Sequence, residues 1–118
     1  MNAGAPSVPI PSAPVLPAIY EATRGKDGAV LRGVELTQTQ AVVRRKAGGD
    51  IVICGPETRQ NVQLARVIES AAADGKPIKY EGPHGPPPLW LPHWQQKTPP
   101  PEGHSFHETH VRRARTAP

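Results

Sequence analysis

The sequence predicts a small α+β domain: a short sheet covered by about two helices, with a long proline-rich loop that bears histidines. Consecutive β-branched residues at Ile51, Val52 and Ile53 are typical of a strand buried on both faces. Apolar residues at helical spacing follow in residues 57–73. A chain of 118 residues has room for one such domain.

Composition divides the chain into an arm, a domain and a tail. Residues 1–17 hold five of the sixteen prolines and no periodic pattern, so we predict an extended arm. The arm lacks a basic stretch followed by an unbroken apolar one, which argues against a signal peptide. The domain is predicted at residues 18–111 and a frayed basic tail at residues 112–118. No run of eighteen apolar residues occurs, so we expect no membrane span.

The first part of the domain is predicted to form a hairpin. Residues 18–23 are typical of a short strand, and residues 29–31 are the expected return strand. The turn at residues 24–28 ends in an Asp-Gly pair, which supplies the positive φ that tight hairpin turns need.

Residues 34–47 fit either a helix or a strand, and we favour a helix. Thr37 or Thr39 is a suitable N-cap, and Gly48 with Gly49 is a good helix stop.

The last turn of this helix would carry three consecutive cations, Arg44, Arg45 and Lys46. Cations there interact favourably with the helix dipole, which is our main interpretation. Phosphate contact is the alternative, and it would make them substrate-binding residues together with Lys97 and Trp94. The formal net charge of +4 fits a polyanionic partner such as nucleic acid, and it fits an ordinary solvated surface equally well.

The second part of the domain is predicted to contain a strand, a helix and another strand. The strand at residues 50–54 is followed by a helix that starts at Pro56 and Glu57 and ends before an Asp-Gly pair. Alternation around Ile78 and Tyr80 predicts the next strand. These elements could form a right-handed crossover.

Residues 82–103 are predicted to be a stiff, irregular loop docked on the sheet. Three prolines in a row occur twice, and both tryptophans lie here. Large apolar rings are costly to leave in water, and proline lowers the entropy cost of holding one loop shape. A final strand is expected at residues 105–109.

The single cysteine, Cys54, excludes an intrachain disulfide. A reactive thiol needs electropositive, partly exposed surroundings, whereas Cys54 lies in an apolar run. We therefore interpret it as a small buried hydrophobe rather than a nucleophile.

All the histidines lie in the last third of the chain, at His84, His93, His104, His107 and His110. His84 and His93 each follow a proline, whose restricted backbone suits an acid–base pair that must be held in place. Two histidines that face one scissile phosphate could take a proton and return it, while a nearby Lys or Arg stabilises the developing charge. His84, His93 and His104 are therefore the candidate catalytic residues of a metal-independent ribonuclease.

Other roles for the histidines stay open. His93 could simply pack its loop beside a tryptophan, and His107 and His110 are expected on the surface of a terminal strand. The three candidate histidines, or a carboxylate such as Glu81 or Glu108, could instead hold a metal ion. Their spacings of nine and eleven residues match no zinc motif, so we predict neither metal nor other cofactor.

Several motifs in residues 50–108 point in one direction: GDIVICG, N-x-x-L-A-R-x-I-E at residues 61–69, and PH, LPHWQ and EGHSFHE. With them, about half of the chain resembles a C-terminal toxin module of bacterial polymorphic toxins, such as those on rearrangement-hotspot and secretion-associated proteins. The chain departs from that pattern in its richer proline content and in the arm before Pro17. The resemblance implies an interbacterial effector, often a nuclease, that is secreted or injected, acts in the target-cell cytoplasm and is neutralised by a cognate immunity protein.

Together these observations predict a toxin nuclease, with RNA favoured over DNA as its substrate. The alternatives are a metal-dependent nuclease and a non-enzymatic module that binds a protein partner through Trp90 and Trp94 in the proline-rich loop.

Overall fold

The structure is a computed structural model that describes residues 16–118, so all but the end of the predicted arm lies outside the described residues. The strands, in chain order, are β1 (Ala18–Arg24), β2 (Val30–Leu36), β3 (Asp50–Cys54), β4 (Ile78–Glu81), β5 (His93–Gln96), β6 (Ser105–His107) and β7 (Arg115–Thr116). The helices are the short 3-10 turn η1 (Lys26–Gly28), α1 (Gln38–Lys46) and α2 (Thr58–Ala73). Across residues 16–118, no helix is both long enough and apolar enough to cross a bilayer.

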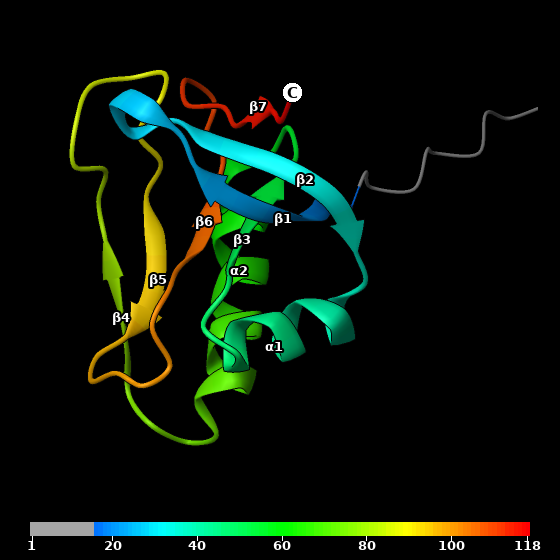
Figure 1. Cartoon of the computed structure of the whole chain (residues 1–118), viewed down its shortest axis with the longest axis vertical. Helices are drawn as coiled ribbons and strands as arrows, with labels where there is room; N and C mark the ends of the chain where they lie inside the picture. The colour runs from blue at the N-terminus through cyan, green and yellow to red at the C-terminus, as the bar shows by residue number, and fades with distance from the viewer. Residues whose placement is uncertain (1–15) are drawn as a thin grey trace, which may run out of the picture.

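The strands form one mixed sheet in the order β4-β5-β6-β3-β1-β2-β7 (Figure 1). β3 pairs in parallel with β6, and β2 pairs in parallel with β7, whereas the other neighbours are antiparallel. One small α+β domain therefore results, as predicted, although its seven-stranded sheet is wider than the short sheet that we expected.

Both helices pack on one side of the sheet, which we call the helix face. Alternate residues of β3, Ile51 and Ile53, point to this face and are fully buried. They pack against Ala41 of α1 and against Ala65 and Ile68 of α2. Burial of these side chains holds the helices to the sheet, because each fully buried isoleucine contributes roughly 1.5–3 kcal/mol.

The opposite side, which we call the loop face, is covered by the loop after β4 and by the C-terminal segment. Val52 and Phe106 point to it and pack against Leu91. The indole of Trp90 lies against Gly28 and Gly85, where an added Cβ would come within 2.1 and 2.4 Å of the ring. Gly28 also has a φ of +82°, so glycine suits this position for two reasons. The predicted docking of the loop is confirmed.

The helix favoured within residues 34–47 is present as α1, and Thr37, one of the two predicted N-caps, is its N-cap. The residues before it, up to Leu36, belong to β2 instead. The Thr37 hydroxyl accepts from the backbone N–H of Gln40, and the Gln40 side chain accepts from the backbone N–H of Thr37. This capping box sets the point at which strand gives way to helix.

Two segments expected to be irregular are strands. β5 lies within the predicted loop and pairs with β4 and β6. The predicted crossover from β3 through α2 to β4 therefore passes over two intervening strands, β6 and β5. The tail predicted to fray contains β7, which pairs with β2. Its backbone is fixed further by a hydrogen bond from the Ala117 N–H to the Arg32 carbonyl.

Candidate active site on the loop face

The three candidate histidines come together on the loop face. His84 lies in the loop after β4, His93 begins β5, and His104 immediately precedes β6. The ring centroids are 5.6 Å apart for His84 and His93, and 4.6 Å apart for His93 and His104. Strand register places His93 on this face. It is paired across the strands with Glu81 and with Phe106, so the side chains of His93, Glu81 and Phe106 lie on the same face of the sheet.

His93 is the buried member of this row, with 2% of its surface exposed. Its Nε2 lies 2.8 Å from the side-chain oxygen of Gln95, whereas its buried Nδ1 makes no well-aligned hydrogen bond within residues 16–118 and has only a weak contact with the Leu91 backbone. Burial, followed by the neighbouring His104, lowers the pKa of His93 below 6.5, although contacts with Gln95, the Leu91 backbone and Glu81 oppose the shift. A neutral His93 ring therefore lies between the two more exposed rings of His84 and His104 and packs against both.

His104 forms a pair with Asp50, at the start of β3. Its backbone N–H donates to Oδ1 of Asp50 at 2.7 Å, and its Nδ1 lies 3.2 Å from the same oxygen. Burial alone would raise the pKa of Asp50, but the hydrogen bonds and charge of His104 outweigh it and lower that pKa. An ionised carboxylate can only accept, so Nδ1 carries a proton and Nε2 is the ring nitrogen free for chemistry.

Glu81 connects the other two histidines. Its Oε1 lies 3.5 Å from Nε2 of His84 and 3.7 Å from Nε2 of His93, while its Oε2 pairs with the Lys79 ammonium at 3.0 Å. The hydrogen bond from Lys79 is the main cause that lowers the pKa of Glu81. One ligand atom from each of Glu81, His84 and His93 lies within 4.8 Å of the others, so these residues could hold a metal ion. Glu108, the other predicted carboxylate, instead accepts from the Ala114 N–H.

One cation beside the histidines was not predicted. The guanidinium carbon of Arg24, at the end of β1, lies 5.3 Å from the centroid of the Phe106 ring. The same ring packs against His93 and His104, with centroids 5.3 and 5.1 Å away. Arg24 is exposed, so its charge is available to an anionic substrate. No feature of the sequence near Arg24 predicts this position, because the pairing of β1 within the sheet brings it beside the histidines.

The predicted cation cluster does not face the histidines. Arg45 is fully buried and gives a two-pronged ion pair to Glu69, with hydrogen bonds of 2.8 and 2.9 Å, so it cannot bind a substrate. Arg44 donates to the backbone carbonyls of Asp50 and Ala22 and therefore ties α1 to the sheet. Burial therefore corrects the phosphate-binding alternative for Arg45, whereas for Arg44, which is 30% exposed, it stays a prediction.

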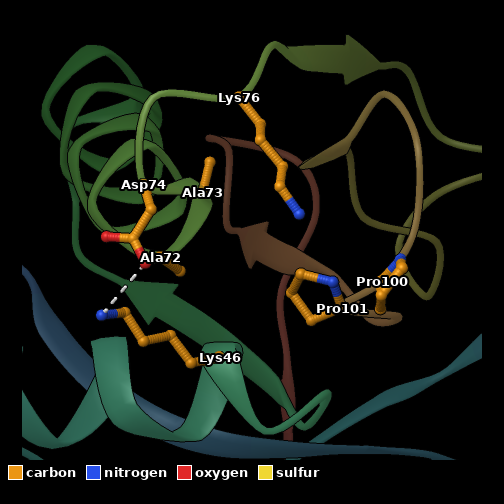
Figure 2. A pocket seen from close by; sticks show the side chains of 7 residues that line it. All are labelled: Lys46, Ala72, Ala73, Asp74, Lys76, Pro100 and Pro101. Atoms are coloured by element: carbon orange, nitrogen blue, oxygen red, sulfur yellow. Dashed lines mark ion pairs between the residues drawn. The ribbon is translucent and has the colours of Figure 1, made fainter.

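Lys46 borders a separate pocket on the helix side. A cavity of about 290 Å³ lies between the end of α2 and the Pro100–Pro101 turn, and Lys46 pairs there with Asp74 at 3.5 Å (Figure 2). The Lys76 side chain extends toward the same space (Figure 2). The lining of this cavity contains no histidine, and its Lys46–Asp74 pair is exposed to solvent, so the histidine row is the better candidate for chemistry.

The other predicted substrate residues also lie elsewhere. Trp94 follows His93 on β5 and therefore points to the helix face, where it packs against Tyr80 with centroids 4.9 Å apart. Arg66 lies over its ring. Lys97 is exposed just beyond the end of β5. Because Trp90 and Trp94 are both packed within the domain, the structure gives little support to a docking loop built from them.

The last two histidines, His107 and His110, differ in burial. His107 was expected on the surface but is fully buried on the helix face. Its Nδ1 donates to the Glu108 carbonyl at 3.0 Å, and its Nε2 accepts from the Tyr80 hydroxyl at 2.8 Å. His110 is exposed, as predicted.

The prediction for Cys54 is confirmed. The thiol is free and buried, and burial, followed by the charge of Glu108, raises its pKa to about 12. Such a thiol is protonated at neutral pH and is a poor nucleophile.

Comparison with known proteins adds no family: no family model, curated protein or solved structure matches the chain. The class of protein must therefore be inferred from the site.

Proposed function

We propose that this chain is a ribonuclease that cleaves RNA by histidine acid–base catalysis and needs no metal ion. The observation that carries the proposal is the row of three histidines on one sheet face, with His104 oriented by Asp50. Histidines are the side chains best suited to exchange protons near neutral pH.

The partly exposed histidines take the proton-transfer roles. Nε2 of His104 removes the proton from the RNA 2′-hydroxyl, whose oxygen attacks the adjacent phosphorus. His84 protonates the departing 5′-oxygen, so one strand ends in a 2′,3′-cyclic phosphate and the other in a 5′-hydroxyl. Because His93 is 2% exposed, it acts beneath them as a positioning residue rather than as the partner of His84. Arg24 stabilises the negative charge that develops on the phosphate.

RNA cleavage in the presence of a chelator tests the proposal. His104→Ala and His84→Ala should each slow cleavage by about 10²- to 10⁴-fold, since each removes a proton-transfer step. The matched control is His110→Ala, which removes an exposed histidine outside the row and should leave the rate unchanged. Melting curves should show that all three variants are folded.

The substrate and product distinguish this chemistry from other nucleases. A 2′-deoxy oligonucleotide lacks the attacking hydroxyl and should resist cleavage, and mass spectrometry should find the cyclic phosphate. Equal cleavage of DNA in chelator, or full activity of both His84→Ala and His104→Ala, would rule out the mechanism.

The biological role follows from the resemblance to polymorphic toxin modules. His93 and His104 lie inside the LPHWQ and EGHSFHE motifs that carry that resemblance. We therefore infer that the chain is an injected or secreted effector that acts in the cytoplasm of a competing bacterium and is blocked by an immunity protein. Expression in a bacterial cytoplasm should stop growth, whereas expression of His104→Ala should not. Co-expression of a small acidic protein encoded beside the chain should restore growth.

A further inference from the structure

The structure assigns a binding site for a divalent transition-metal ion to Glu81, His84 and His93, and an ion there takes His84 out of proton transfer. The site itself stands apart from the proposed function, whereas its inhibitory effect rests on that function. Imidazole nitrogens with one carboxylate oxygen are ligands that Zn²⁺ favours, and three protein ligands leave a fourth position open.

The distances suit such an ion. Ligands at 2.0–2.1 Å from a tetrahedral centre lie roughly 3.3–3.5 Å from one another. Oε1 of Glu81 is already 3.5 Å from Nε2 of His84 and 3.7 Å from Nε2 of His93. The set as a whole spans no more than 4.8 Å, so small side-chain rotations complete the site.

The ligands are also held in place by the fold. Glu81 and His93 are direct partners across the β4–β5 pair, and His93 is almost fully buried. His84 follows a proline, and Arg112 fixes the next residue by donating to the Gly85 carbonyl at 3.0 Å. A site prepared in this way loses little entropy when it binds an ion.

Two nearby groups oppose the ion. The side-chain oxygen of Gln95 lies 2.8 Å from Nε2 of His93 and must move away before that nitrogen can bind a metal. The other group is Lys79. Its ammonium pairs with Oε2 of Glu81 at 3.0 Å and leaves Oε1 to the metal. Its positive charge lowers affinity without blocking the position.

Occupancy of this site has a direct chemical consequence. A His84 nitrogen that donates its lone pair to a metal cannot carry the proton that the leaving 5′-oxygen requires. Metal binding and catalysis therefore compete for the same ring.

Zinc titration of the chelator-stripped full chain by calorimetry tests the site. One Zn²⁺ should bind per chain, and Co²⁺ should give the visible absorption of a tetrahedral complex. Glu81→Gln and His84→Ala should each weaken binding by more than about 100-fold, because loss of a ligand exceeds the 10- to 100-fold cost of losing an outer-shell partner.

Two control variants make the result specific. Asp50→Asn removes a carboxylate that also faces a histidine on the same face, and it should leave zinc affinity unchanged. Lys79→Met removes the competing cation and should tighten binding. Absence of zinc binding by the wild type, or equal binding by wild type and Glu81→Gln, would overturn the site whatever the protein does to RNA.

Activity measurements then separate the site from the proposed function. The stripped wild type should cleave RNA, and saturating Zn²⁺ should abolish cleavage. If zinc binds and only the loaded protein cleaves RNA, the site stands, whereas its inhibitory effect and the metal-independent mechanism both fail. If zinc binds and inhibits nothing in an active protein, His84 is not the acid and the inhibitory effect is wrong.

Discussion

The two faces of the sheet both bury ionisable side chains, but they partner them differently. On the helix face, the carboxylate of Glu69 accepts two hydrogen bonds from Arg45, one from Gln96 and one from Ser105, all between 2.6 and 2.9 Å. On the loop face, the buried His93 makes no well-aligned hydrogen bond at Nδ1 within the described residues. Buried polar groups are almost always satisfied. Among the unpartnered buried side-chain atoms of the described residues, the His93 nitrogen is the one that belongs to an ionisable group, and this marks the loop face as the place where chemistry is expected.

The contrast holds for ionisable groups in particular. The helix face also contains unpartnered atoms, an oxygen on Gln96 and the indole nitrogen of Trp94, but a neutral amide and an indole cannot exchange a proton at ordinary pH. Ionisable side chains thus stabilise the fold where their polar atoms have partners within the protein. Where a polar atom lacks such a partner, the side chain remains available to a substrate. Histidine shows this within one chain, since His107 uses both ring nitrogens internally, whereas the only ring hydrogen bond of His104 within residues 16–118 is at Nδ1.

The largest test of this comparison is removal of the buried cation on the helix face. Arg45→Ala leaves the Glu69 carboxylate buried without its counter-charge and should lower the free energy of unfolding by about 3–5 kcal/mol. Urea denaturation measures the loss. Lys46→Ala is the matched control: Lys46 is the next residue on α1, but it is exposed and should change stability by no more than about 0.5 kcal/mol. Similar losses in the two variants would show that the Arg45–Glu69 pair is not a stabilising element.

A second test asks whether the helix face carries the apolar core. Ile53→Ala on β3 and Ile68→Ala on α2 remove fully buried side chains from one cluster, so each should cost about 2–5 kcal/mol. Val43→Ala, on the exposed side of α1, should cost far less in the same denaturation experiment. Effects near zero at both isoleucines would contradict a core between the helices and the sheet.

Local sequence signals predicted the elements of the helix face well. The β-branched run gave β3, and helical spacing followed by an Asp-Gly pair gave α2, which ends where Asp74 and Gly75 take left-handed backbone angles. β5 and β7 escaped prediction because their only support is pairing with distant strands, and β5 lacks β-branched residues.

Sequence also identified the contents of the candidate site, but not its partnerships. Residue type and proline context point to the histidines, and the fold brings His84, His93 and His104 together. Asp50, which orients His104, lies 54 residues away in the chain, and Glu69 lies 24 residues from Arg45. Partnerships at such separations depend on strand register, which composition and periodicity do not encode. For that reason the run Arg44 to Lys46, which is typical of a helix end, did not indicate the buried ion pair between Arg45 and Glu69.

The smallest expected effect concerns the pH dependence of stability. Burial lowers the pKa of His107 below 6.5, and the Glu108 carbonyl opposes this only in part. The unfolded chain therefore binds the proton more readily than the folded one, so stability is complete above the unfolded pKa. It falls as the pH drops below about 6.5, until the folded pKa is passed, by at most about 1.4 kcal/mol per pH unit for each such histidine. The pKa of His93 is lowered in the same direction, so the wild-type slope has two contributions.

His107→Gln can keep both hydrogen bonds without titrating, and it should make the slope of stability against pH shallower in chelator between pH 7 and 5. Asp50 does not disturb that window, because its lowered pKa places its titration below 3.8. An unchanged slope in His107→Gln would show that His107 is protonated as readily in the folded chain as in the unfolded one.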